Sequence, residues 1–281
     1  MNRKIASLLG VILSVLIIFL ISNSISIIPG SIEEDYGWKF VILGDTQDLS
    51  AHRPDLFFNA TQWIAKQSDI IYVTQMGDLV DNKENLTQWQ TAYDAMHILD
   101  GHVEWGTVPG NHDLYPMPIN GTAYGGEDPT NYNAFFGECE HYDIVKNQFI
   151  FIYVRFDHLD YAESVIQDHP NLYTVIVTHS CVFTDTLYDE NLVERVAEYD
   201  NVIAVLCGHN PGSTLVRCSN GRGGEISLIL TNYQDIPPIT NSLKVCTVFK
   251  DRIEVKTFEP MNNTYKNGSY GFMEEFSFSY D

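Results

Sequence analysis

The chain has 281 residues, of which 37 are Asp or Glu and 16 are Lys or Arg, giving a formal net charge of -21 at pH 7. Such an acidic chain argues against binding to the backbone of a nucleic acid, because contact with phosphates requires a basic surface. The charge fits a well-solvated protein that works outside the cytoplasm or in a salt-adapted organism, and it would favour divalent cations as partners.

The N-terminal segment, residues 1–30, combines a basic start with a long apolar run. Arg3 and Lys4 precede residues 5–22, which carry no charge. This pattern is typical of a signal peptide or of an N-terminal membrane anchor. Ser22-Asn23-Ser24 is a weak cleavage site, which favours an uncleaved anchor. With Arg3 and Lys4 inside, the remainder would face outward, so we expect an extracytoplasmic protein, membrane-anchored or secreted.

Residues 31–281 are enough for one large α/β domain with a substantial core. Helical stretches at residues 55–67 and 86–99 alternate with apolar runs, as expected of βα units. The apolar runs predict buried strands at residues 39–43, 70–74, 103–108, 172–177 and 202–207.

Towards the C-terminus the pattern changes to short β-rich runs. These runs are residues 226–230, 243–249 and 252–258, and the last two are joined by two residues, as in a hairpin. The mixture predicts a sheet that is parallel at its centre and antiparallel towards its edge. Residues 149–178 form a short stretch with little room for a cap domain, which favours an open cleft.

Polar side chains follow the predicted strands at the point where each strand ends. The segments are Gly44-Asp45-Thr46-Gln47, Gly77-Asp78-Leu79-Val80-Asp81, Gly110-Asn111-His112-Asp113, Thr178-His179 and Gly208-His209-Asn210, with Asn232-Tyr233-Gln234 late in the chain. Taken singly, Gly-Asp and Gly-Asn pairs after strands are often plain turns. Taken together, they predict one site, because ligands bind beyond the carboxyl ends of the strands in an α/β sheet.

The residue types in these segments suit metal-assisted hydrolysis of a phosphate ester. Two divalent ions about 3.5–4 Å apart that share one carboxylate can activate a water molecule and neutralise phosphoryl charge. A mixture of Asp oxygens, an Asn carbonyl and neutral imidazoles suits Mn, Fe, Zn or Co better than Ca. That mixture is supplied by Asp45, Asp78, Asn111, His179 and His209.

The ordered segments resemble the signature of the calcineurin-like metallophosphoesterases, which runs D-x-H, G-D-x-x-D, G-N-H-D/E, a lone H and then G-H-x-H. The resemblance extends from Lys39 to Pro260. It implies an α/β fold, a two-sheet αββα sandwich, and metal-dependent hydrolysis of a phosphate mono- or diester through a metal-activated water. Residues 132–137 and 232–234, with the Asp-Thr-Gln first motif, resemble a secreted or membrane-anchored branch of the family.

Carried over to this chain, the resemblance implies that Asp78 bridges two metal ions. Asn111, His179 and His209 would complete one metal position, and Asp45 would ligate the other.

The same resemblance gives His112 a catalytic role without a bond to metal. His112 would face the phosphate as a general acid or as a hydrogen-bond donor to the developing charge. Asp113 could orient His112, and Asp81 could support a metal ligand.

Two positions depart from the family pattern. Gln47 stands where D-x-H has its histidine, and Pro211 stands where G-H-x-H has its second histidine. In the family both missing imidazoles belong to the same metal. A Gln amide is a neutral oxygen donor, acceptable to Mn or Mg but weaker for Zn or Fe, and proline has no ligating side chain. We therefore expect two divalent ions (Mn, Fe, Zn or Mg), one of them held weakly by Asp45, a share of Asp78 and the Gln47 carbonyl.

Three hypotheses remain open on these residues. The chain is a working phosphoesterase, a degenerate relative that binds one metal and a phosphate ligand with little or no turnover, or a surface protein that keeps the fold for packing alone. Retention of His112 favours the enzyme, because a scaffold has no need of that imidazole.

The cysteines and the other histidines give weaker signals. Cys139, Cys181, Cys207, Cys218 and Cys246 leave at least one thiol unpaired, and three of them lie in apolar runs, so buried free thiols and a disulfide both remain open. The remaining histidines are expected at the surface, with His52 the nearest to the site.

Overall fold

The computed structural model describes residues 37–116, 126–138, 141–155, 158–221, 223–234, 238–266 and 273–280. The predicted signal peptide or anchor, residues 1–30, lies outside the described residues, as does Cys139. The described residues from Gly37 onward are built on two β-sheets. Among them, no helix combines the length and the apolar character needed to cross a membrane.

The first sheet has the strand order β12-β11-β10-β1-β2-β3, and β13 pairs with β11. Its strands β1, β2 and β3 are parallel, whereas β10 to β13 are antiparallel to their neighbours. The strands are β1 (Lys39–Leu43), β2 (Ile70–Gln75), β3 (Glu104–Thr107), β10 (Leu243–Val248), β11 (Arg252–Glu259), β12 (Thr264–Tyr265) and β13 (Glu275–Ser279). The predicted hairpin is therefore confirmed as β10 and β11.

The second sheet has the strand order β4-β5-β6-β7-β9-β8. Strands β5, β6, β7 and β9 are parallel, and the edge strands β4 and β8 are antiparallel. The strands are β4 (His141–Lys146), β5 (Phe149–Val154), β6 (Tyr173–Val177), β7 (Val202–Cys207), β8 (Gly212–Ser219) and β9 (Glu225–Asn232). The second sheet thus confirms the prediction of a parallel centre with antiparallel strands towards the edge. In the first sheet the parallel strands β1, β2 and β3 instead occupy one side, with β3 at the edge, and the antiparallel strands occupy the other side.

The two sheets pack face to face through aromatic and branched side chains. Phe40 of β1 meets Phe151 of β5 with ring centroids 5.4 Å apart, in an edge-to-face arrangement. The buried hydroxyls of Tyr72 and Tyr153 hydrogen-bond across the interface at 2.6 Å, and Tyr153 also donates to Thr74 at 2.8 Å. These bonds satisfy polar atoms that would otherwise be costly to bury between the sheets.

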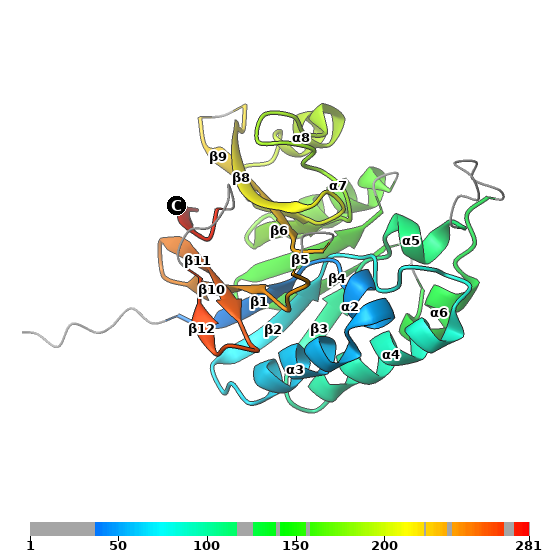
Figure 1. Cartoon of the computed structure of the whole chain (residues 1–281). Helices are drawn as coiled ribbons and strands as arrows, with labels where there is room; N and C mark the ends of the chain where they lie inside the picture. The colour runs from blue at the N-terminus through cyan, green and yellow to red at the C-terminus, as the bar shows by residue number, and fades with distance from the viewer. Residues whose placement is uncertain are drawn as a thin grey trace, which may run out of the picture. The chain divides into compact units, whose positions relative to one another are not determined.

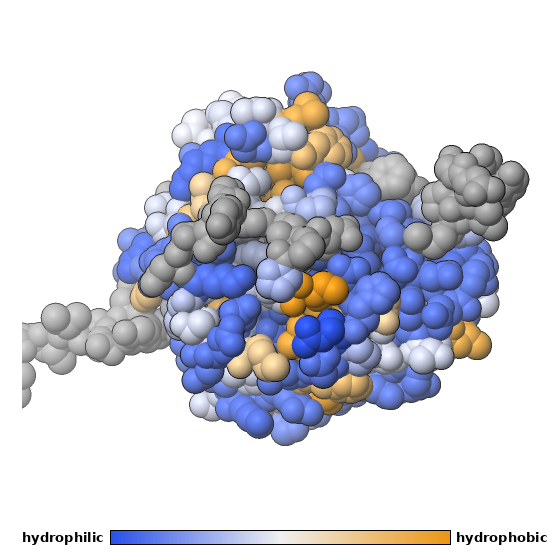
Figure 2. Space-filling view, viewed as in Figure 1, coloured by the Kyte–Doolittle hydropathy of each residue, from blue (hydrophilic) through white to orange (hydrophobic). Residues whose placement is uncertain are grey.

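Helices cover the outer face of each sheet, which confirms the αββα sandwich (Figure 1). Those against the first sheet are α2 (Gln47–His52), α3 (Pro54–Ala65), α4 (Leu86–Met96) with the 3-10 turn η1 (His97–Leu99), and α6 (Thr130–Phe136). Those against the second sheet are α7 (Leu159–Asp168) and α8 (Glu190–Val196). A single turn, α5 (Asn111–Leu114), follows β3. The face seen in Figure 2 is largely hydrophilic over α4, α5 and α6, as expected of a chain with a net charge of -21.

Residues 149–178, which were expected to leave little room for a cap domain, contain β5, α7 and β6, and all three elements belong to the sandwich. Cys181, Cys207, Cys218 and Cys246 are buried free thiols, so none of the described cysteines forms a disulfide.

Candidate metal centre

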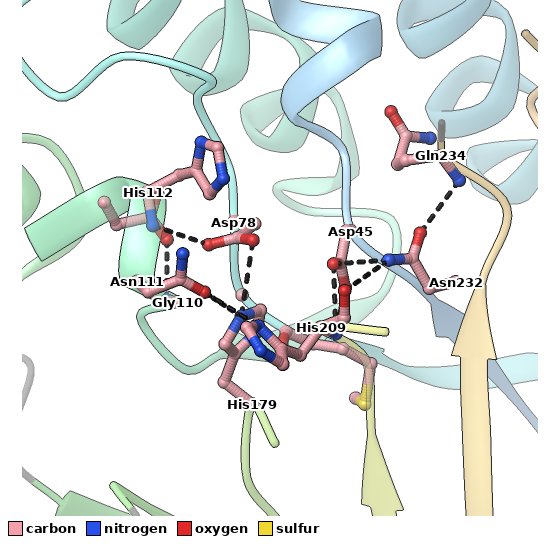
Figure 3. Close-up of polar contacts among 12 residues, drawn as sticks. Asp45, Asp78, Gly110, Asn111, His112, His179, His209, Asn232 and Gln234 are labelled. Carbon is pink, nitrogen blue, oxygen red and sulfur yellow. Dashed lines mark hydrogen bonds and ion pairs between the residues drawn. The ribbon is translucent and has the colours of Figure 1, made fainter. Parts of the chain in front are cut away.

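Five of the predicted ligands follow five parallel strands. Asp45, Asp78 and Asn111 come after β1, β2 and β3 of the first sheet, and His179 and His209 come after β6 and β7 of the second. Because the carboxyl ends of these strands meet at one edge of the sandwich, the side chains converge there (Figure 3).

The glycines of the motifs allow the close approach of these segments. A Cβ atom on Gly110 would lie 2.1 Å from Oδ1 of Asp78, and one on Gly208 would lie 1.9 Å from Oδ1 of Asp45. Gly77 has a φ of 92° and Asp78 a φ of 50°, both in the left-handed region. The Gly-Asp and Gly-Asn pairs are therefore turns, as such pairs after strands often are. These turns bring the carboxylates to the site.

Four side chains form one tight cluster. The ligand atoms of Asp78, His179 and His209 all lie within 4.8 Å of one another. Oδ1 of Asn111 lies 3.1 Å from Nε2 of His179 and 2.8 Å from Nδ1 of His209, and a carboxylate oxygen of Asp78 lies 3.3 Å from the same Nε2. One carboxylate, one amide oxygen and two imidazoles therefore surround a common point.

The orientation of His179 favours binding of a cation in the cluster. Its Nδ1 donates to the backbone carbonyl of Met76 at 2.8 Å, which leaves Nε2 facing the oxygens of Asp78 and Asn111. Burial acts to lower the pKa of His179, but the carboxylates of Asp78 and Asp45 raise it to about 10. A proton on Nε2 supplies the positive charge that these oxygens require, and a divalent ion can replace that proton. The donor set thus fits one fully ligated ion.

Asp45 lies beside this cluster and is held by donors of its own. The backbone N–H of His209 lies 3.1 and 3.0 Å from its two carboxylate oxygens, and Nδ2 of Asn232 donates to one of them at 2.7 Å. Asn232 in turn accepts the backbone N–H of Gln234 at 2.8 Å (Figure 3). Burial raises the pKa of Asp45 well above its usual range. A cation next to Asp45 would offset that cost of burial.

Gln47 and Pro211 are the two residues at which the sequence departs from the family pattern for the second metal ion. Gln47 begins α2 and is 5% exposed, and its Oε1 atom finds no hydrogen-bond partner among the described residues. A buried carbonyl oxygen without a partner is costly, and coordination to a cation would satisfy it. Pro211 offers no ligand atom, so the second position fits a cation with fewer donors than the first.

Asp81 and Asp113 make contacts that differ from those expected of them. The ring of His112 has Nδ1 2.8 Å from the backbone carbonyl of Asp81 and 3.6 Å from its carboxylate, so Asp81 orients the ring. The carboxylate of Asp113 instead accepts the backbone N–H groups of Leu79, Val80 and Gly110 at 2.9, 3.1 and 2.8 Å. Asp113 therefore fixes the loop that carries Asp78. The backbone N–H of His112 donates to Asp78 at 2.9 Å.

Residues that the motifs did not single out hold the ligand loops. Gln75 ends β2, is fully buried, and donates through Nε2 to the carbonyls of Gly44 and Gly77 at 3.3 and 2.8 Å. Its sequence signal is a polar residue inside an apolar run just before Gly77-Asp78. The sequence could not predict that the backbone carbonyl of Met76 orients His179, because every residue has such a carbonyl. His52, expected nearest to the site, is exposed on α2.

Among curated proteins the chain is similar to the uncharacterized protein YvnB of Bacillus subtilis (strain 168), with 27% identity over 279 residues that cover 87% of this chain. The chain spans 22% of the length of YvnB.

Two solved structures share the fold at low identity. The purple acid phosphatase PPD1 from yellow lupin (Lupinus luteus) seeds is 14% identical with a TM-score of 0.60, over 86% of this chain and 53% of that one. GAP50, the anchor in the inner membrane complex of Plasmodium, is 13% identical with a TM-score of 0.50, over 86% of this chain and 88% of that one. A family model described as calcineurin-like phosphoesterase matches residues 39–213, and the chain therefore belongs to that family.

Proposed function

We propose that this protein is a metal-dependent hydrolase of a phosphate mono- or diester. The observation that carries the proposal is the convergence of Asp78, Asn111, His179 and His209 around one point, with Asp45 beside it. Divalent ions bound there would lower the pKa of a water molecule and offset charge on the phosphoryl oxygens. Asp78 would bridge the two ions, and Gln47 would lend its amide oxygen to the weaker position.

His112 is proposed to act on the phosphate rather than on the metal. The contact of its Nδ1 with the carbonyl of Asp81 leaves Nε2 as the ring atom for the substrate. Its backbone N–H is bound to Asp78, which fixes the imidazole relative to the bridging carboxylate. From that place His112 would donate a hydrogen bond to the phosphoryl oxygens or a proton to the leaving group. Asp113 would contribute by holding the loop of Asp78 in place.

The departures at Gln47 and Pro211 favour one alternative, a relative that binds one metal and a phosphate ligand with little or no turnover. Both positions lower the number of donors for the second ion, whereas the first cluster is complete. The two functions share the first metal position and differ in whether hydrolysis occurs.

Hydrolysis of 4-nitrophenyl phosphate and of bis(4-nitrophenyl) phosphate tests the proposal. The protein is stripped with a chelator and reloaded with Mn, Mg, Zn or Fe, and release of nitrophenol is followed. We expect activity that requires added metal and is lost in Asp78→Asn. A stripped protein that takes up one ion and binds inorganic phosphate, but hydrolyses neither ester with any metal, would establish the alternative.

We also propose that residues 1–30 attach the protein to a membrane, with the domain outside the cytoplasm. The basic start and the apolar run support this, since the positive end stays inside. Fractionation of cells that express the full chain or a chain lacking residues 1–30 tests it. Recovery of the full chain in the soluble cytoplasmic fraction would contradict the proposal.

A further inference from the structure

The buried side chains of Asn232 and Gln234 contact the two segments that carry the proposed ligands of the second metal position. Nδ2 of Asn232 donates to the carboxylate of Asp45 at 2.7 Å. Oε1 of Gln234 accepts the backbone N–H of Asp48 at 2.9 Å, and Asp48 directly follows Gln47 in the first turn of α2. The side-chain carbonyl of Asn232 also accepts the backbone N–H of Gln234 at 2.8 Å (Figure 3). The orientation of this short segment therefore influences where Asp45 and the start of α2 lie.

Tyr233, the residue between these two, is bound into a buried polar network. Its hydroxyl lies 2.8 Å from Oγ1 of Thr257 on β11 and 3.5 Å from a carboxylate oxygen of Glu274. Nζ of Lys244, a fully buried residue of β10, donates to the same Oγ1 at 2.7 Å and to the backbone carbonyl of Met273 at 2.6 Å. Because Tyr233 follows β9 of the second sheet, whereas Thr257 and Lys244 belong to the first, the network joins the two sheets.

Buried charges hold this network in one arrangement. Burial lowers the pKa of Lys244 to about 8, and the carboxylate of Glu274 opposes this shift, so Lys244 is mostly charged at pH 7. A buried ammonium or carboxylate that loses its partners is strongly destabilising, because its charge is then uncompensated away from water. A fully bonded polar network of this kind is rigid. The hydroxyls of Thr257 and Tyr233, which link Lys244 to Glu274, are therefore fixed in place.

We propose that Tyr233 is a positioning residue for the second metal position and acts through the residues on either side of it. Its hydroxyl is anchored by Thr257, and this anchor orients Asn232 towards Asp45 and Gln234 towards α2. The inference rests on the proposed function, because it requires a cation beside Asp45. It adds to that function a residue that contacts neither the metal nor the substrate but sets the affinity for the weaker ion.

Titration of the chelator-stripped, full-length protein with Mn²⁺ tests the inference without need of turnover, with free Mn²⁺ measured by electron paramagnetic resonance. The native protein should bind one ion tightly and a second more weakly. Tyr233→Phe removes the hydroxyl but keeps the ring, and it should weaken binding of the second ion by about threefold to tenfold, the contribution of one net hydrogen bond. The affinity for the first ion should change less, because its ligand His179 is oriented by the carbonyl of Met76. Thr257→Val should act as Tyr233→Phe does, whereas Thr257→Ser, which keeps the hydroxyl, should retain the native affinity.

Tyr72→Phe is the matched control, because it removes another buried tyrosine hydroxyl, one that bonds Tyr153 at 2.6 Å between the sheets. Like Tyr233→Phe, it should lower the melting temperature. It should leave the affinities for both ions unchanged. A role of Tyr233 in stability alone would give the same result for the two variants.

The outcomes separate this inference from the proposed function. If the native protein binds two ions, and Tyr233→Phe and Thr257→Val bind the second as tightly, the positioning role is overturned while the proposed function stands. An equal loss of the second ion in Tyr72→Phe would likewise overturn it. A native protein that binds one ion alone would remove the second position, and this inference with it, while the first position stands. If the native protein binds no Mn²⁺, the proposed function fails as well. Circular dichroism identifies a variant that does not fold, and the other of Tyr233→Phe and Thr257→Val then decides the result.

Discussion

The two proposed metal positions at the strand ends differ in the number of ligand atoms that this chain provides for them. The first has a carboxylate, an amide oxygen and two imidazoles gathered around one point. The second has Asp45, whose oxygens already accept N–H donors, and Gln47, whose amide oxygen is buried without a partner among the described residues. Pro211 provides no ligand atom for this second position. We therefore predict that one ion binds tightly at the first position, whereas a second ion would bind from solution by mass action.

The ligands of the first position are also part of the backbone framework. Asp78 accepts the N–H of His112, and its own carbonyl accepts the N–H of Thr46 at 2.9 Å. His179 is locked by the carbonyl of Met76. Loss of such a residue therefore disturbs metal, loop and neighbour together, whereas changes at the second position should act on one ion alone.

The largest expected effect is that of Asp78→Asn. This change removes the shared negative charge but keeps an oxygen that can accept the N–H of His112. Loss of a residue that only orients a metal ligand typically lowers metal affinity by up to about 100-fold, and we expect a larger fall in this variant. Hydrolysis should fall to background. Metal content by mass spectrometry and the nitrophenol assay measure the two effects. Asp168→Asn, at an exposed carboxylate that ends α7, is the control. A variant that keeps its ion and half of its activity would show that Asp78 does not bridge.

His112→Asn should separate catalysis from metal binding. Turnover should fall about 10²–10⁴-fold, the usual contribution of a positioned general acid, because the imidazole acts on the phosphate. Metal content should be unchanged, since the backbone N–H that binds Asp78 remains. His102→Asn, at an exposed histidine, should leave both unaltered. Near-native turnover in His112→Asn would remove this residue from the mechanism.

Asn232→Ala should weaken the second position without affecting the first. The change removes the N–H donor that holds Asp45 at 2.7 Å, and residues that orient a ligand typically contribute about 10–100-fold in metal affinity. The concentration of Mn that gives half-maximal activity should therefore rise, while the tightly held ion remains after dialysis. Asn262→Ala, at an exposed asparagine, serves as the control. An equal loss of both ions would show that the two positions are not independent.

The smallest effect is expected from restoring the missing imidazoles. The native protein should retain nearer one ion than two after dialysis, and its activity should rise with added Mn or Mg. The double variant Gln47→His, Pro211→His should lower the concentration of added metal needed for half-maximal activity, most of all for Zn, because it supplies two imidazole ligands where the native chain has one amide oxygen and a proline. Each single variant is the matched control and should act in the same direction more weakly. Two ions held tightly by the native protein would mean that some other residue completes the second position.

The parallel strands of the two sheets were the part of the fold most open to prediction. Strands β1 and β7 begin and end at the predicted residues, and β2 is longer by one. Strands buried on both faces appear as continuous apolar runs, which stand out in a sequence. The edge strands β4 and β8 have mixed burial and polar side chains, and nothing in the sequence separated them from loops.

The side chains at the ends of the strands, and the two missing imidazoles, could be predicted from the sequence alone, because each motif is local and directly follows an apolar run. The contacts of those side chains could be known only from the tertiary structure. Asn232 contacts Asp45, which is 187 residues away in the sequence, and Arg155, directly after β5, binds Glu127, which lies between α5 and α6. Asp113 was expected to orient the ring of His112, but its carboxylate accepts the backbone N–H groups of Leu79 and Val80. Such contacts depend on how two sheets pack, and packing joins residues whose separation along the chain leaves no local pattern.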